Sequence, residues 1–268
     1  MERPYRIMGV LNVTPDSFSD GGRFLDAEAA VAHGLALEAE GADILDVGGE
    51  STRPGAEAVA ADEQIRRVVP AIERLVTRGV QAQLSVDTTR VAVAEAAVAA
   101  GATYVNDVSA FRADPELAGL VADRGLDCCL SHMRGEPRSM QADPVYDDVV
   151  ADVKAFLEER LGAAVAAGIA EERIMLDPGI GFGKTLVHNL ELLRRLDELV
   201  ELGRPIVIGT SRKSFLGRLT GRETGDRLAG TIATNVLALE RGATVFRVHD
   251  VGPVADALAV TAATVRDR

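Results

Sequence analysis

The amino-acid sequence predicts an α/β fold, a single (β/α)8 (TIM) barrel, from three observations. Short β-branched segments alternate with longer segments that are rich in Ala, Leu and Val and have helical periodicity. Eight such units fit within the 268 residues, which is the length of a typical (β/α)8 barrel. No linker rich in glycine, serine or proline interrupts the chain, so residues 1–268 are predicted to form one domain. A doubly wound sheet is the alternative, but it would need fewer strands or a longer chain.

Eight segments are predicted to be the barrel strands, because each is short, rich in β-branched residues and followed by polar residues. In chain order they are residues 6–13, 43–48, 83–87, 104–108, 127–132, 173–177, 205–209 and 245–249. The clearest helical periodicity lies between them, at residues 62–78, 145–167 and 254–266. Six helices are predicted to end at a glycine, namely Gly79, Gly101, Gly125, Gly168, Gly203 and Gly242.

The composition excludes several functional classes. Lys and Arg number 29 against 41 Asp and Glu, and this net charge of −12 argues against binding to nucleic acid or to an anionic membrane. The two cysteines, Cys128 and Cys129, are neighbours in a strand and point to opposite faces, so we expect no disulfide and a reducing compartment. We find no signal peptide and no apolar run long enough to span a membrane. The protein is therefore predicted to be cytoplasmic.

Polar residues gather at the carboxyl ends of the predicted strands, where barrel enzymes carry their active sites. Strands seven and eight are followed by cationic residues, and strands three, four and six by carboxylates and an amide. The cationic group consists of Lys213, Arg247 and His249, and the acidic and amide group of Asp87, Asn106 and Asp177. We expect the two groups to lie at opposite sides of the barrel mouth.

These two groups predict an elongated substrate. Lys and Arg bind phosphate directly, while carboxylates and amides accept hydrogen bonds from the N–H groups of a nitrogen heterocycle. Asn12 and the acidic loop after it could add a hard cation such as Mg²⁺, which prefers oxygen ligands and diphosphate.

Each of these residues also has a structural interpretation. Asn12 could cap a strand, Asp87 could cap the following helix and Asp177 could start a turn. His249 could be a buried histidine with satisfied hydrogen bonds. We expect the glycines of residues 179–185 to shape a turn into the next helix, since the Walker pattern would need a glycine at Pro178.

Three further polar residues are predicted to have no catalytic role. Lys184 is expected at the surface. Asp46 and Glu50 are expected to brace the loop after the second strand.

Six motifs follow one another along the chain. Residues 8–22 read MGVLNVTPDSFSDGG, and residues 49–55 read GESTRPG. Four shorter motifs come after them, namely NDVS at 106–109, DPGIGFGK at 177–184, SRKS at 211–214 and RVHD at 247–250. The two long motifs closely resemble the signatures of the dihydropteroate synthase family, and the shorter ones occur in the order of that family. The resemblance covers essentially the whole chain.

The resemblance implies an enzyme of folate biosynthesis. It would join 6-hydroxymethyl-7,8-dihydropterin diphosphate to 4-aminobenzoate, giving 7,8-dihydropteroate and diphosphate. Both substrates are small molecules, and the family resemblance suggests a homodimer formed through outer helices near the carboxyl terminus.

The resemblance also assigns roles to matching residues. The pterin would lie deep in the barrel, against Asp87, Asn106, Asp177 and Lys213. The diphosphate would be bound by Asn12, Thr52, Arg247 and His249, with Mg²⁺ at the Asn12 position. The loops around Asp16 and Arg53 would close over the site, and 4-aminobenzoate would pack near Thr52, Pro54, Phe182 and Ser214, where sulfonamides compete.

Two positions depart from the family pattern. Ala110 stands where many members have glycine, and Ser131 stands where methionine is usual. Neither position is expected to contact a substrate.

Three other functions remain as alternatives. A pterin-dependent methyltransferase domain uses a similar barrel, but it has no diphosphate for residues 14–22 and 211–214 to hold. A paralogue could bind a pterin without turnover. A generic phosphosugar barrel would account for Lys213 and Arg247 but not for the carboxylates and the amide.

Overall fold

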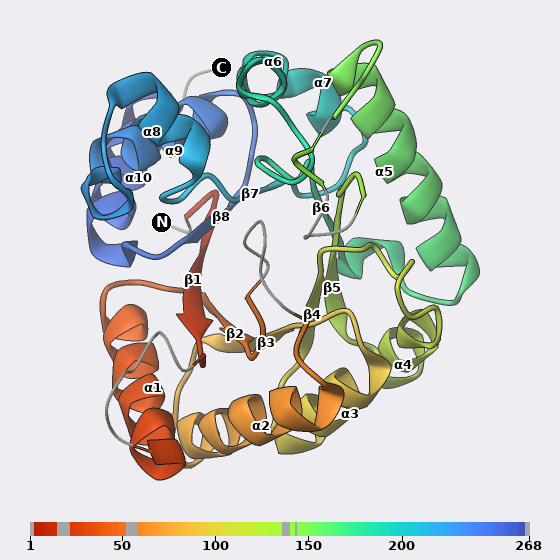
Figure 1. Cartoon of the computed structure of the whole chain (residues 1–268), viewed down its shortest axis with the longest axis vertical. Helices are drawn as coiled ribbons and strands as arrows, with labels where there is room; N and C mark the ends of the chain where they lie inside the picture. Colours follow the sequence, from red (N-terminus) through yellow and green to blue (C-terminus); the bar gives the residue numbers. More distant parts are fainter. Residues whose placement is uncertain (1–2, 15–21, 52–57, 136–139, 143, 266–268) are drawn as a thin grey trace.

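The computed structural model describes residues 3–14, 22–51, 58–135, 140–142 and 144–265. Within these ranges, eight parallel strands form one sheet in the order β6-β5-β4-β3-β2-β1-β8-β7. A further parallel bridge joins Leu176 of β6 to Ile206, directly before β7, and so closes the sheet into a barrel. Figure 1 shows the strands at the centre with the helices arranged around them. The predicted (β/α)8 barrel is confirmed.

All eight predicted strands are present, with ends that differ by at most two residues. They are β1 (Arg6–Asn12), β2 (Ile44–Gly48), β3 (Gln83–Asp87), β4 (Tyr104–Asp107), β5 (Asp127–Ser131), β6 (Ile174–Asp177), β7 (Val207–Ile208) and β8 (Val245–Val248). The seventh is the shortest, because Pro205 and Ile206 contact β6 and β8 through single backbone hydrogen bonds rather than a full ladder.

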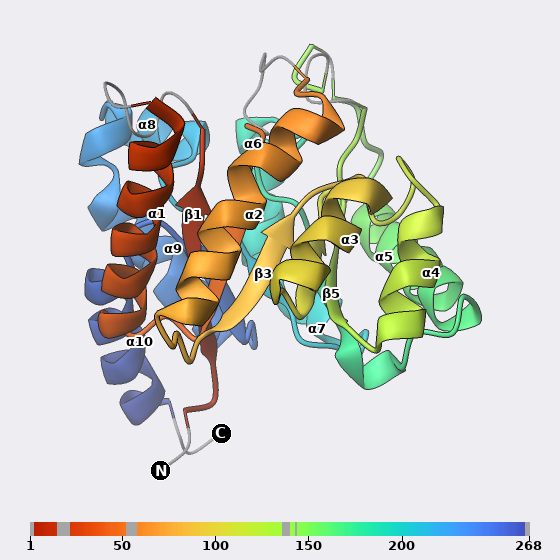
Figure 2. The same cartoon turned by 90° about the horizontal axis from the view of Figure 1, so that it is seen from below.

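The helices follow the strands and form the outer layer, and Figure 2 shows α1, α2 and α3 side by side on one flank. The α-helices are α1 (Gly22–Ala39), α2 (Ala61–Thr77), α3 (Val91–Ala100), α4 (Glu116–Arg124), α5 (Val149–Ala166), α6 (Leu186–Arg194), α7 (Asp197–Val200), α8 (Ser214–Thr220), α9 (Leu228–Glu240) and α10 (Val251–Thr264). Short 3-10 turns lie at Glu171–Arg173 and Thr224–Asp226. No described helix is long and apolar enough to cross a membrane.

Local residue chemistry sets the helix ends. The helix expected to begin at residue 145 begins at Val149, because the Asp148 carboxylate accepts the backbone N–H groups of Val150 and Ala151 as an N-cap. All six glycines predicted to end helices have a positive φ, which disfavours other residues there.

The strands carry two apolar layers, one on each face. The outward layer packs against the helices and contains Cys128, while Cys129 belongs to a separate cluster inside the barrel. The two thiols therefore point to opposite faces, as predicted, and burial raises the pKa of both. The interior cluster takes one residue from each of seven strands, namely Met8, Ile44, Tyr104, Cys129, Met175, Val207 and Val245. It forms an apolar floor across the barrel.

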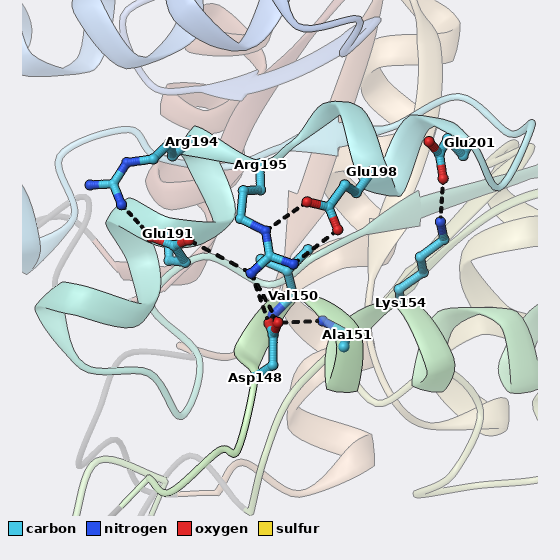
Figure 3. A network of polar contacts seen from close by, with 9 residues as sticks. All are labelled: Asp148, Val150, Ala151, Lys154, Glu191, Arg194, Arg195, Glu198 and Glu201. Carbon is cyan, nitrogen blue, oxygen red and sulfur yellow. Dashed lines mark hydrogen bonds and ion pairs between the residues drawn. The ribbon is translucent and has the colours of Figure 1, made fainter.

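An ion-pair network centred on Arg195 connects α5, α6 and α7 (Figure 3). One terminal nitrogen of Arg195 lies 3.0 Å from both carboxylate oxygens of Asp148, and the guanidinium also contacts Glu198 at 2.6 and 3.0 Å. Asp148 is itself the N-cap of α5. Arg195 thus joins the start of one helix to two others, whereas the neighbouring Arg194 pairs with Glu191 alone.

Replacing Arg195 with methionine is expected to lower the Tm by roughly 2–4 °C, because networked ion pairs contribute more than single exposed ones. Arg194→Met is the matched control and should change the Tm by less than about 1 °C. Thermal unfolding at low and high salt checks this, since salt screens exposed pairs. Equal Tm values for the two variants at low salt would contradict the structure.

Candidate active site

A polar layer lies directly above the apolar floor, at the carboxyl ends of the strands. Side chains two positions apart in a strand share a face. The residue two positions after a floor residue therefore also points into the barrel, nearer the carboxyl end of the strand. In this way Ile44 is followed by Asp46, Tyr104 by Asn106, Cys129 by Ser131, Met175 by Asp177 and Val245 by Arg247. The alternation of the strands therefore creates one polar surface inside the barrel.

Arg247 of β8 is bound between two carboxylates of this layer. Its Nε donates to Asp46 at 2.7 Å, and one terminal nitrogen donates to Asp87 at 2.8 Å. Asp46 is fully buried and also accepts hydrogen bonds from the Ser85 hydroxyl at 2.6 Å and the Asn106 amide at 2.8 Å. Asp46 is thus the central acceptor of a buried network from four strands.

This network corrects two predictions. The cationic and acidic groups do not lie at opposite sides of the barrel mouth, since Arg247 contacts Asp87 directly. Asp46 does not brace the loop after the second strand; it holds Arg247 and Asn106. Glu50 does brace that loop, because its carboxylate accepts the Val59 N–H at 2.7 Å and the Gln64 amide at 3.0 Å.

Burial and neighbouring charges shift the pKa values of Asp87 and Arg247. Desolvation raises the pKa of Asp87 to about 7, although the nearby Arg247 guanidinium acts in the opposite direction. Burial acts to lower the pKa of Arg247, but Asp46 and Asp87 together raise it above its usual value. Arg247 therefore stays charged, while Asp87 changes its protonation state near neutral pH.

Lys213 lies at the β6 side of the same surface. Its Nζ donates to the carbonyl of Ile180 and lies 4.3 Å from the centre of the Phe182 ring, in a cation–π contact. Burial lowers the pKa of Lys213 to about 8, with the Asp177 carboxylate acting against this shift. Ser214, the next residue, is exposed at the start of α8.

Asp177 ends β6 and orients the loop that follows it. One oxygen of its carboxylate accepts the Gly179 N–H at 2.7 Å, so the turn interpretation of this residue holds. Its other oxygen lies 3.5 Å from the hydroxyl of Ser131, one of the two departures from the family pattern. The other departure, Ala110, has a φ of +53°, where glycine would be unstrained.

His249 lies beside the end of β7. Its backbone N–H donates to the Ser211 hydroxyl at 3.1 Å, and its Nδ1 lies 3.0 Å from the same oxygen. An Arg212–Asp250 ion pair, with contacts of 2.5 and 2.9 Å, joins the same two loops. These contacts hold the imidazole on the β7–β8 side of the barrel mouth.

Asn12 occupies the same level of the barrel as Asp87. The strand register pairs Asn12 with Gly48, Gly48 with Asp87, and Asp87 with Asn106. A Cβ at Gly48 would lie 3.5 Å from the amide oxygen of Asn12 and 3.6 Å from the Asp87 Cβ, so this glycine leaves space between the two side chains. No group of three or more His, Cys, Asp or Glu that could hold a metal ion occurs among the described residues.

The structure brings most of the predicted site residues to one end of the barrel. Asp16, Thr52, Arg53 and Pro54 lie outside the described residues. The sequence analysis did not predict the role of Asp46. Strand alternation places Asp46 and Gly48 on the same face, so this pattern could have indicated that Asp46 points into the site.

Lys184 is also not where it was predicted. It is 2% exposed, and its Nζ lies 2.8 Å from Nδ1 of the buried His132. No pattern around Lys184 signals its burial, because its acceptors come from the backbone of the preceding loop and from His132, in the segment after β5.

Comparison with known proteins identifies relatives along nearly the entire chain. The family model for "Pterin binding enzyme" matches residues 8–249. The dihydropteroate synthase of Mycobacterium leprae is 49% identical over 268 residues, covering 97% of this chain and 93% of the relative. That of Escherichia coli K12 is 44% identical over 259 residues, covering 97% and 91%.

Solved structures agree with these relatives. Xanthomonas albilineans dihydropteroate synthase with 4-aminobenzoic acid has a TM-score of 0.92 at 53% identity, covering 98% of this chain and 93% of the other. The X. albilineans enzyme with 7,8-dihydropteroate gives 0.88 at 50% identity, covering 98% and 94%. The Yersinia pestis enzyme with a sulfonamide drug gives 0.91 at 43% identity, covering 97% and 94%. The chain therefore belongs to the pterin-binding enzymes and, within them, to the dihydropteroate synthases.

Proposed function

We propose that this chain joins 6-hydroxymethyl-7,8-dihydropterin diphosphate to 4-aminobenzoate by a dissociative substitution, with the polar layer of the barrel as the catalytic surface. Family membership gives the reaction. The observation that carries the site assignment is the Arg247 guanidinium, which lies against Asp87 in the same layer as Asn106 and Asp177. Arg247 therefore joins the two parts of the site: it contacts a carboxylate that would bind the pterin, and its own positive charge would bind the diphosphate.

The pterin ring would lie against the polar layer, above the apolar floor. Asp87 and Asp177 would accept its N–H groups, and Asn106, fixed by its bond to Asp46, would contact the ring edge. Because a buried N–H group without an acceptor is costly, this arrangement favours a ring rich in N–H donors over an apolar ring of the same size.

The diphosphate would bind above the ring. Arg247 has five N–H donors, and its two contacts among the described residues leave three for an anion. The donors for the diphosphate would come from Arg247, His249, Asn12 and Thr52, while Lys213 would contact the pterin and the charge that develops beside it. The positive charge of Arg247 is already in place before the reaction, so the leaving group is stabilised without reorganisation.

Mg²⁺ would bind together with the diphosphate. Mg²⁺ is commonly held by one or two protein oxygens plus substrate phosphates, and the Asn12 amide oxygen at the end of β1 fits such a site. The described residues offer no complete protein cage, which also agrees with a metal that arrives with its substrate. When bound, Mg²⁺ would neutralise charge on the leaving diphosphate.

In the dissociative step, the C–O bond to the pterin methylene breaks and diphosphate leaves with the electron pair. The cation is delocalised into the pterin ring, where Asp87 and Asp177 stabilise it electrostatically. The aniline nitrogen of 4-aminobenzoate then attacks the methylene carbon and loses a proton. Closure of the loops around Asp16 and Arg53 would exclude water, which would otherwise trap the cation.

The 4-aminobenzoate would pack near Phe182 and Ser214, together with Thr52 and Pro54. The Phe182 ring is held against Lys213, so it offers a fixed aromatic surface beside the pterin site. Sulfonamides share the aniline group of 4-aminobenzoate, and we propose that they compete here, as the sulfonamide complex of the Y. pestis enzyme suggests.

We also propose a cytoplasmic homodimer. The two buried cysteines without a disulfide agree with a reducing compartment. Val260 of α10 is 67% exposed, which suits an interface through outer helices near the carboxyl terminus.

The proposed activity is tested by mixing the protein with pterin diphosphate, 4-aminobenzoate and Mg²⁺. We expect dihydropteroate and free diphosphate in equal amounts, and a loss of about 100-fold or more in kcat for Arg247→Met, because one preorganised donor set is removed. Removal of Mg²⁺ with a chelator should also suppress turnover. A folded wild-type protein that binds the pterin without forming product would instead support a non-catalytic paralogue.

The dissociative step is tested with pterin diphosphate carrying ¹⁸O in the bridging position. If the C–O bond breaks reversibly before attack, the label should move into the non-bridging oxygens of the α-phosphate when 4-aminobenzoate is absent. ³¹P NMR of the recovered substrate, in which bridging and non-bridging ¹⁸O shift the phosphorus resonance differently, measures this exchange, and Arg247→Met should abolish it. Turnover without any exchange, and without diphosphate release in the absence of 4-aminobenzoate, would exclude the dissociative pathway.

The pKa of Asp87 predicts how pterin binding depends on pH. An ionised Asp87 can accept N–H groups at both oxygens, whereas the protonated carboxyl carries a donor and less acceptor capacity, so affinity for a pterin without phosphate should fall as the pH drops below about 7, by up to about tenfold per pH unit. Calorimetry between pH 8 and pH 5.5 measures this. Asp87→Asn should bind more weakly and with a much flatter profile, and an unchanged profile in that variant would remove Asp87 from this role. Asp123→Asn, at an exposed position on α4, is the control.

A further inference from the structure

The loop between β6 and α6 comprises residues 178–185, and side chains fix its backbone over residues 179–183. Each carbonyl from Gly179 to Gly183 accepts a hydrogen bond from a side chain. The donors are Lys184 for Gly179 and Phe182, Lys213 for Ile180, Gln141 for Gly181 and Tyr146 for Gly183. None of residues 179–183 is exposed, and each carbonyl has a side-chain partner, so the course of this segment is closely constrained.

The loop also lies very close to the segment after β5. Gly179 has a φ of +67°, and a Cβ there would lie 1.8 Å from the His132 carbonyl oxygen. Gly183 has a φ of +63°, and a Cβ there would lie 2.5 Å from the Arg134 carbonyl oxygen. Only glycine fits at these two positions, and their close approach brings Lys184 next to His132.

The Lys184 nitrogen lies within a set of three close acceptors. It is 2.9 Å from the Gly179 carbonyl oxygen, 3.0 Å from that of Phe182 and 2.8 Å from Nδ1 of His132. An ammonium group has three N–H donors and a neutral amine has two, so three acceptors fit the ammonium.

The same contacts determine the state of His132. Since Nδ1 accepts the Lys184 hydrogen bond, the imidazole is neutral and carries its proton on Nε2. Burial and the adjacent Lys184 charge lower the pKa of His132 to about 2, which agrees with this state. Burial also lowers the pKa of Lys184, while Asp177 acts against that shift.

Lys184 is connected to the active site through the loop that it holds. Its two carbonyl acceptors, Gly179 and Phe182, lie on either side of Ile180, whose own carbonyl binds Lys213. Phe182 also carries the ring that contacts Lys213. A shift of either end of this short turn would therefore move both the Phe182 ring and the Ile180 carbonyl that binds Lys213.

We propose that Lys184 is a positioning residue for this reaction: its ammonium, bound by Gly179, Phe182 and His132, fixes the turn that places Phe182 and Lys213. The proposal rests on the function proposed above, in which Phe182 contacts 4-aminobenzoate. It assigns Lys184 to the capture of the second substrate, while the pterin is still bound by Asp87 and Asn106, which belong to other strands.

The first test compares Lys184→Met with wild type in steady-state kinetics and in pterin binding by calorimetry. We expect the KM for 4-aminobenzoate to rise at least tenfold, and the Kd for a pterin without phosphate to rise by a clearly smaller factor, because Asp87 and Asn106 still bind the ring when Lys213 shifts. Lys154→Met, at a lysine on α5 that pairs with Glu201, is the matched control and should leave both values unchanged. A lower Tm with unchanged kinetics would reduce Lys184 to a stabilising role and overturn the proposal, as would equal losses for both substrates.

A second pair of variants tests the same contact without altering Lys184. His132→Leu removes the acceptor and should raise the KM for 4-aminobenzoate, whereas His132→Asn offers an amide oxygen in its place and should stay within about threefold of wild type. Equal KM values for these two variants would contradict the proposal even if Lys184→Met does not fold. Absence of synthase activity in the wild type would instead refute the proposed function, so the two failures are distinguishable.

Discussion

The structure of this site depends on the pairing of one buried arginine with two buried carboxylates. A charge inside a barrel is costly without partners, and Arg247 satisfies this constraint by bonding both Asp46 and Asp87. The same bonds orient the guanidinium and leave three of its donors for an anion. The position of Asn106 depends on the same partner, since its amide bonds to Asp46. Stability and substrate recognition therefore share one group of residues.

The fold was predictable because it rests on local regularities that repeat. Alternation within each strand and glycines with positive φ at helix ends both follow from backbone geometry, and all six glycines predicted to end helices do have a positive φ. The candidate site residues were predictable to the extent that they sit at strand ends or in family motifs. Asp87, Asn106, Asp177 and Arg247 do lie together in one layer.

What could not be predicted depends on contacts between distant segments. The sequence shows Asp46 only as a polar residue in a buried strand, and its importance arises from donors on three other strands. Lys184 follows a glycine-rich turn, and a lysine at such a position is expected at the surface. It is buried because that turn folds back on the segment after β5. Likewise, the mixing of cations and carboxylates in one layer follows from the curvature of the barrel, which brings β8 within reach of β3 for a long side chain, although β1 and β2 lie between them in the sheet.

The central claim is that Asp46 acts through Arg247, and a double-mutant cycle tests it most directly. Asp46→Ala, Arg247→Ala and the double variant would be compared by kcat/KM for the pterin diphosphate, with the fold of each checked by circular dichroism. If Asp46 serves to hold Arg247, its loss should matter little once Arg247 is absent, and the coupling energy should be about 2 kcal/mol or more. Additive effects, within about 0.5 kcal/mol, would contradict the account.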